Sequence, residues 1–145
     1  MNASPESKNE AVIHRFYEEL WNCWRVDVAD EIVSEAVLFR GSLGRVCEGR
    51  DEFKCYVEDV RAAFPDWHNR IDEVISDGDR VVTRMTWTGT HRGLLGDLKP
   101  TGARVEYGGA SFFRLDGDLI EEAWVVGDTQ ELWRALGVLP ARIGK

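Results

Sequence analysis

The segment GTHRGLLGDLKPTGARVEYGGASFFRLDGDLIEEAWVVGD, Gly89–Asp128, decides the fold. It contains turn signals at Pro100-Thr101-Gly102 and Asp116-Gly117-Asp118, and between them apolar and polar side chains alternate. Such alternation is typical of a strand with one buried face. A further turn signal, Asp77-Gly78, precedes the segment. The pattern predicts four sequentially connected antiparallel strands near 67–76, 79–91, 103–115 and 119–127.

Before residue 67 the apolar period is helical. Between Lys8 and Trp24 apolar residues recur at three- and four-residue steps, which predicts an amphipathic helix. The other predicted elements are a short helix from Asp27 to about Ala36, a strand at Val37–Arg40, a helix from Asp51 to Pro65, and a helix from Thr129 to Leu136. Helices followed by strands favour an α+β fold with helices on one face of a curved sheet and a concave pocket between them.

The 145 residues fit a single domain, 1–145, in which we expect residues 1–8 to form a flexible N-terminus. A hydrophobic content of 43%, with six Trp and six Phe, is enough for a core and an apolar cavity. The formal charge of −8 opposes binding to a phosphate backbone, so nucleic acid is not an expected partner.

Targeting and cofactor signals are not found in the sequence. The first ten residues lack an apolar signal-peptide core, and no run approaches the ~20 apolar residues of a membrane span, which predicts a cytoplasmic protein without a membrane partner. Cys23, Cys47 and Cys55 have neither disulfide-framework nor zinc-site spacing. Glycine-rich phosphate-binding motifs and His-Glu-x-x-His are also missing. We therefore expect no cofactor and no metal.

Asp128 is the main candidate for chemistry. It ends the last predicted strand, on which period two would place Ile120, Trp124 and Val126 on its face. Desolvation beside Trp124 would favour the protonated carboxyl group and suit it to proton transfer near neutral pH. The alternative is that Asp128 only caps the following helix, with Glu131 completing a capping box.

Six short motifs carry a family resemblance. They are Arg15-Phe16-Tyr17-Glu18-Glu19, Leu20-Trp21-Asn22, Ala62-Ala63-Phe64-Pro65-Asp66, Gly89-Thr90-His91-Arg92-Gly93, Pro100-Thr101-Gly102 and Glu122-x-Trp124-x-x-x-Asp128. From Ala11 to Leu139 the chain resembles the SnoaL-like polyketide cyclases of the nuclear transport factor two-like superfamily. The resemblance implies a cone-shaped α+β barrel with a pocket at its wide end and a homodimer formed through the outer sheet face. It also implies a cofactor-free intramolecular aldol ring closure, as in antibiotic biosynthesis and other secondary metabolism, with an aspartate as acid and base.

Two further polar residues are candidates. His91 ends a strand, where a neutral imidazole can donate to a substrate carbonyl and stabilise an enolate, or instead bond the backbone of its turn. Arg40 follows Phe39 where many family members have a histidine shortly after the phenylalanine. Its guanidinium suits an enolate oxygen or a substrate carboxylate, although a surface ion pair is the commoner arrangement.

Aromatic side chains are candidates for substrate binding. They are suited to the walls of a pocket for a flat polycyclic ligand, but aromatic residues at helix or strand spacing are more often plain core. Trp124 is the strongest pocket candidate because it shares the predicted face of Asp128. The candidates are Tyr17, Trp21, Phe39, Trp87, Phe113 and Trp124.

The sequence hypothesis is an enzyme in which Asp128 removes a proton from an activated methylene of a hydrophobic, polyketide-like molecule. The enolate then attacks a ketone of the same folded substrate. An isomerase or dehydratase, a cyclase that works by shape alone and a non-catalytic binding domain remain alternatives. Epoxide hydrolysis by an Asp-Arg-Asp device is disfavoured because no acidic residue lies between Arg80 and Gly96.

Overall fold

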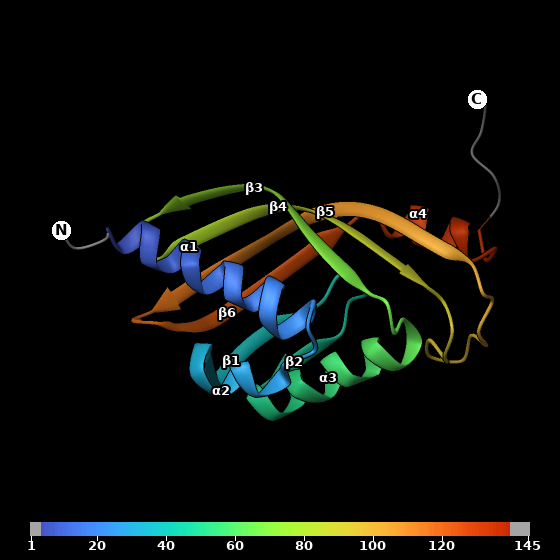
Figure 1. The fold of residues 1–145 in the computed structure, drawn as a ribbon, viewed down its shortest axis with the longest axis horizontal. Coiled ribbons are helices and arrows are strands. Elements are labelled where there is room, and N and C mark those ends of the chain that lie inside the picture. The colour runs from blue at the N-terminus through green and yellow to red at the C-terminus, as the bar shows by residue number, and fades with distance from the viewer. Residues whose placement is uncertain (1–3, 140–145) are drawn as a thin grey trace.

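A computed structural model describes residues 4–139, in which helices cover one face of a curved sheet (Figure 1). The helices are α1 (Pro5–Arg15), the π-helical turn η1 (Phe16–Trp21), the 3₁₀ turn η2 (Val26–Val28), α2 (Ala29–Ile32), α3 (Arg50–Ala63) and α4 (Thr129–Ala135). The strands are β1 (Val33–Arg40), β2 (Val46–Glu48), β3 (His68–Asp77), β4 (Arg80–Thr90), β5 (Arg104–Asp116) and β6 (Leu119–Gly127). The α+β fold class is confirmed.

The six strands form one sheet in the order β2-β1-β6-β5-β4-β3. The four strands from β3 to β6 are antiparallel and sequentially connected, as the turn signals predict. Two features were not predicted: β1 pairs in parallel with β6, and the short strand β2 forms within the glycine-rich segment 41–49. No pairing joins the two outer strands, β2 and β3, so the sheet is curved but not closed.

The first helix begins at Pro5, where Ser4 supplies the cap by accepting a hydrogen bond from the backbone N–H of Ser7 at 3.1 Å. It therefore starts inside the segment 1–8, of which residues 1–3 lie outside the described part of the chain. The same helix changes at Phe16 into the π-turn η1, where the N–H of Asn22 donates to the carbonyl oxygen of Tyr17, five residues earlier, at 2.9 Å. Turns of this kind often occur at functional sites.

The second helical segment is shorter than predicted. It ends at Ile32, and β1 begins at Val33 rather than at Val37. Val33 has extended backbone angles and pairs with Ile120 of β6. Its β-branched side chain is buried, and such side chains favour a strand over continued helix.

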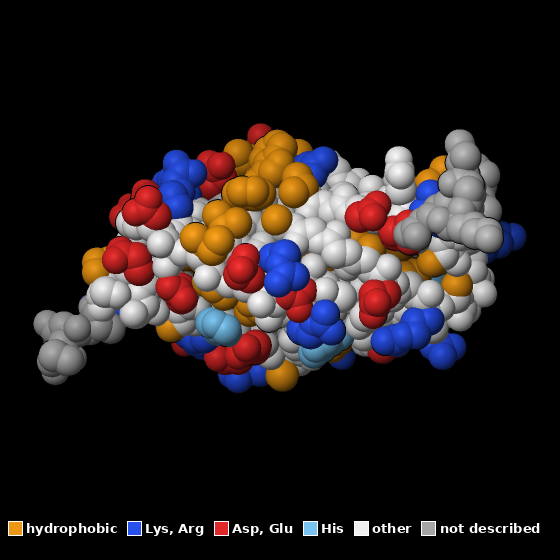
Figure 2. Space-filling model, turned by 90° about the horizontal axis from the view of Figure 1, so that it is seen from above, with side chains coloured by type: hydrophobic (Ala, Val, Ile, Leu, Met, Phe, Trp, Pro, Cys, Tyr) orange, Lys and Arg blue, Asp and Glu red, His pale blue; other side chains and the backbone are white. Residues whose placement is uncertain are grey.

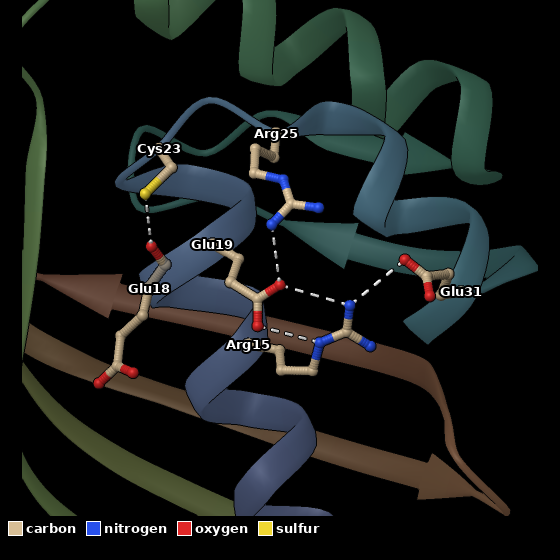
Figure 3. Close-up of polar contacts among 6 residues, drawn as sticks. All are labelled: Arg15, Glu18, Glu19, Cys23, Arg25 and Glu31. Atoms are coloured by element: carbon tan, nitrogen blue, oxygen red, sulfur yellow. Dashed lines mark hydrogen bonds and ion pairs between the residues drawn. The ribbon is translucent and has the colours of Figure 1, made fainter.

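Ion pairs hold η1 against α2 (Figure 3). The guanidinium of Arg15 donates to Glu19 at 3.1 Å and to Glu31 at 3.3 Å, and Arg25 reaches the same Glu19 carboxylate at 3.5 Å. These side chains are partly exposed, so each pair adds at most about 1 kcal/mol. Together they fix the position of a turn whose apolar side faces the interior.

A β-bulge changes which side of β6 faces inward. The register of β5 and β6 shifts between Arg114 and Leu115, so Ile120 is buried while Trp124 and Val126 face outward. The prediction that Ile120, Trp124 and Val126 share one face is therefore wrong.

Among residues 4–139, no helix has both the length and the apolar character to cross a bilayer.

Candidate functional site

A cavity of about 480 Å³ lies between η1, α3, the inner sheet face and the loops around residues 41–45 and 94–96. This volume is in the range of small-molecule sites, which are mostly apolar. Its walls are largely aromatic. The rings that line it belong to Phe16, Tyr17, Trp21, Phe39, Tyr56, Phe64, Trp67, Trp87 and Tyr107.

Four of the predicted substrate-binding aromatics line this cavity: Tyr17, Trp21, Phe39 and Trp87. Phe113 does not. It lies below the wall in the core, where its ring makes edge contacts to Phe16 at 5.4 Å and to Tyr17 at 6.0 Å between ring centroids.

Trp124 and Arg40 lie on the outer face of the sheet and do not line the cavity. Trp124 is 42% exposed, and the guanidinium carbon of Arg40 lies 5.2 Å from its ring centroid. The Nη1 of Arg40 also donates to the carbonyl oxygen of Val125 at 2.8 Å. The cation–π contact and this hydrogen bond hold Arg40 on the outer face. The bulge in β6 is the reason that Trp124 faces away from the pocket.

Asp128 follows β6 and occupies the N-cap position of α4. Its backbone N–H donates to Gly108 at 2.8 Å, and its carbonyl oxygen accepts from the N–H of Glu131 at 3.1 Å. Its exposed side chain makes no hydrogen bond or ion pair with any residue in 4–139, and no side-chain cap forms. The carboxylate is therefore available, whereas the predicted capping box is not made.

Neither Asp128 nor its neighbour Gly127 lines the cavity, but Gly127 packs against two of the lining rings. A Cβ added at Gly127 would lie 3.0 Å from the ring of Tyr107 and 3.1 Å from that of Trp87. A side chain at residue 127 would therefore require these two rings to shift by a few tenths of an ångström. The Asp128 carboxylate thus starts one residue beyond the aromatic wall.

His91 is fully buried and does not line the cavity. Its Nδ1 accepts from the backbone N–H of Thr101 at 3.1 Å, so the neutral ring carries its proton on Nε2. Within residues 4–139 that Nε2 has no partner. The bond across the base of the loop 91–103 matches the turn-histidine alternative. This loop carries Leu94 and Leu95 to the cavity mouth.

Three tyrosine hydroxyls gather around the cavity, of which only Tyr17 was a sequence candidate. Burial raises the pKa of Tyr17 and of Tyr56, and it raises the pKa of Tyr107 to about 12. All three phenols therefore stay protonated at neutral pH. Tyr56 could have been found in the sequence, because Phe53, Tyr56 and Val60 recur at three- and four-residue steps within the predicted helix.

The cavity mouth carries charge. Arg45 and Asp59 form an ion pair there, and the guanidinium of Arg45 lies 5.6 Å from the ring centroid of Tyr56. The hydrogen bond to Asp59 raises the pKa of Arg45. In the described part of the chain, no group of three or more His, Cys, Asp or Glu side chains is arranged to hold a metal ion.

The family model of the SnoaL-like polyketide cyclases matches residues 11–136. The chain belongs to this family. The sequence resemblance is thereby confirmed, and membership in the SnoaL-like family supports an enzyme at a coarse level. No curated protein sequence matches the chain.

Solved structures share the SnoaL-like fold. A proposed SnoaL-like polyketide cyclase from Jannaschia sp. CCS1 has 22% identity and a TM-score of 0.86, over 97% of this chain and 99% of that one. AclR, a proposed hydroxylase from Streptomyces galilaeus, has 24% identity and a TM-score of 0.82, over 95% and 90%. A proposed polyketide cyclase from Acidithiobacillus ferrooxidans has 25% identity and a TM-score of 0.77, over 93% and 98%.

Proposed function

We propose that the protein is a cofactor-independent, polyketide cyclase-like enzyme that closes a ring by an intramolecular aldol reaction. The observation that carries this proposal is the cavity of about 480 Å³ with aromatic walls in a member of the SnoaL-like family. Such walls suit a flat, hydrophobic substrate, because aromatic rings favour offset stacking. Holding the reacting carbons together in a dry cavity supplies much of the rate.

In the proposed reaction, Asp128 removes a proton from an activated methylene. The enolate attacks a ketone of the same molecule, and Asp128 returns the proton to the new alkoxide. The carboxylate of Asp128, which has no partner among residues 4–139 and follows a glycine packed on the aromatic wall, supports this role. His91 would contribute by holding the loop at the cavity mouth.

The test is Asp128→Asn, assayed on a linear polyketide ester with adjacent 1,3-dicarbonyl groups. We expect turnover to fall about 10²- to 10⁴-fold, the usual contribution of a positioned acid or base. Ligand affinity should stay within about twofold, because Asp128→Asn keeps the size of the side chain while removing its ability to take a proton. The matched control is Asp118→Asn, an exposed carboxylate in the turn between β5 and β6. Full turnover by Asp128→Asn would contradict the assignment of Asp128 as the general base.

One observation favours a second candidate, a cyclase that acts by shape alone or a domain that only binds. Asp59 is the sole carboxylate among the described lining residues, and it lies at the mouth in an ion pair. A shape-driven cyclase predicts that Trp87→Ala lowers turnover strongly while Asp128→Asn does not. A binding domain predicts tight binding of the ester without any product.

An isomerase or a dehydratase would begin with the same proton transfer. Product analysis separates them from ring closure. A simple aldol closure or an isomerisation preserves the mass of the substrate, whereas a dehydration loses one water. NMR of the product then shows whether a new carbon–carbon bond has formed.

We also propose that the protein forms a homodimer through the outer sheet face. Apolar side chains gather on part of this face (Figure 2). They include Leu38 of β1, Phe112 of β5, and Trp124 and Val126 of β6, all exposed. Phe112 pairs with Trp124 across neighbouring strands, and Val126 lies two residues further along β6. We call these four exposed side chains the outer apolar patch. Patches of this kind commonly mark interfaces.

A further inference from the structure

Of the three tyrosine hydroxyls at the cavity, two are bonded within the protein. The Tyr17 hydroxyl pairs with Ser111 at 2.5 Å, and that of Tyr107 pairs with Ser42 at 2.9 Å. The hydroxyl of Tyr56 makes no hydrogen bond with any residue from 4 to 139, although its side chain is buried. The fold therefore leaves one cavity phenol with its hydrogen-bonding capacity unused.

The ring of Tyr56 is held firmly. Its centroid lies 6.0 Å from that of Trp21 and 5.4 Å from that of Phe39, and the guanidinium of Arg45 covers it at 5.6 Å. The ring cannot turn its hydroxyl away without breaking these contacts. A donor held in this way is pre-organised, which lowers the entropy lost when a ligand binds.

Gly41 leaves room for the hydroxyl of Tyr56. A Cβ at Gly41 would lie 2.3 Å from the Tyr56 oxygen, so any larger residue at this position would displace it. Ser42, the next residue, belongs to the Tyr107 pair. The hydroxyls of Tyr56, Tyr107 and Ser42 thus lie close together on one side of a cavity whose walls are largely aromatic.

The chemistry of the group defines what it can bind. Burial raises the pKa of Tyr56, and the neighbouring Tyr107 adds to the effect. The hydroxyl is therefore protonated at neutral pH and acts as a donor. An unpaired donor in an apolar cavity is costly unless a ligand or water oxygen accepts from it.

We propose that Tyr56 donates a hydrogen bond to a carbonyl or enolate oxygen of a planar aromatic ligand, and that it thereby selects oxygenated rings over hydrocarbon rings. The inference rests on the proposed function only in taking the cavity as the ligand site. It adds a residue, Tyr56, that recognises the ligand oxygen by a hydrogen bond. It also names a ligand class, flat aromatic ketones.

The test compares 9-fluorenone with fluorene, which have the same ring skeleton and differ at the carbonyl. Binding is followed by quenching of tryptophan fluorescence, since Trp21, Trp67 and Trp87 line the cavity. We expect the wild-type protein to prefer fluorenone by about 2- to 10-fold, the range for one neutral hydrogen bond. Tyr56→Phe should abolish this preference and leave fluorene affinity unchanged.

The matched control is Tyr17→Phe, which removes a hydroxyl already bonded to Ser111 and should keep the preference. The infrared carbonyl stretch of bound fluorenone gives a second readout, because it should move to lower frequency in the wild type and not in Tyr56→Phe. An unchanged preference in folded Tyr56→Phe, or failure of both ligands to bind the wild type, would overturn the proposal. Ring closure is not measured, so the outcome is independent of the Asp128 assay.

Discussion

Asp66 joins the end of α3 to the end of β4. Its two carboxylate oxygens accept from the backbone N–H and the hydroxyl of Thr90, each at 2.7 Å. Burial acts to raise the pKa of Asp66, but the hydrogen bonds from Thr90 outweigh it and hold the pKa below its ordinary value. A carboxyl group with a depressed folded-state pKa stabilises the fold above its unfolded pKa of about 3.9.

We therefore expect Asp66→Asn to lower the free energy of unfolding by about 1 kcal/mol at pH 7, a value reduced for solvent screening of this exposed side chain. The difference from wild type should shrink as pH falls through the folded pKa, because both proteins then carry a neutral side chain. Urea unfolding at pH 7 and near pH 3 measures it. The control is Asp116→Asn, an exposed carboxylate at the far end of the sheet.

Single residues also show where sequence reasoning worked at the site. Tyr17 and Trp21 were proposed as cavity walls because aromatic rings suit a flat ligand, and both line the cavity. Trp124 was placed on the wrong side because strict period two does not anticipate a one-residue bulge. Tyr56 was not among the predicted site residues, although it recurs at helical spacing with Phe53 and Val60.

At the scale of elements, the loop 91–103 is held against the end of α3. The backbone N–H groups of Arg92 and Gly93 both donate to the carbonyl oxygen of Ala63, at 2.9 and 3.2 Å. A Cβ added at Gly93 would lie 2.0 Å from the carbonyl oxygen of Ala62. The loop can lie this close to the helix only because residue 93 has no side chain.

Gly93→Ala should accordingly push the loop off α3 and destabilise the fold by about 1–3 kcal/mol, as overpacking does. We expect a lower melting temperature and faster hydrogen exchange in residues 91–103. The comparison variant is Leu94→Ala, which shortens an exposed neighbour and should change stability little. Equal exchange rates in Gly93→Ala and wild type would contradict the role given to this contact.

The elements differ in how far the sequence predicts them. Strands β3 to β6 follow from alternation and turn residues, which are local signals. The π-turn η1 has the same apolar stripe as an ordinary helix, so its extra residue per turn is hidden in the pattern. The strand β2 has three residues in a glycine-rich segment, too few for a periodic signal.

On the scale of the whole molecule, the outer apolar patch offers a test of assembly. We expect the wild type to sediment at about twice the chain mass of 16.5 kDa. Trp124→Glu should produce a monomer, because a charge buried at the centre of an apolar interface is costly. Ile75→Glu, on the edge strand β3, is the control for adding a charge at an exposed apolar position. A monomeric wild type would contradict the dimer.

The order of elements predicted the α+β fold class, but the sequence did not reveal the complete sheet. The parallel pairing of β1 with β6 joins segments about eighty residues apart and leaves no local pattern. The cavity shape depends on this pairing, since Phe39 of β1 and Val125 of β6 both line it. Some of the aromatic residues that line the cavity could be predicted from the sequence, whereas the shape of the cavity could not.

Because β2 and β3 do not pair, the strands alone do not fix the width of the interior. In a closed barrel the strand number and stagger fix the interior width. Here the strands do not complete a ring, and the helix α3 supplies part of the wall through Tyr56, Val60 and Ala62. A substitution that shifts α3 can therefore widen or narrow the chamber while every strand keeps its register. The same sheet can accommodate ligands of different size by moving one helix.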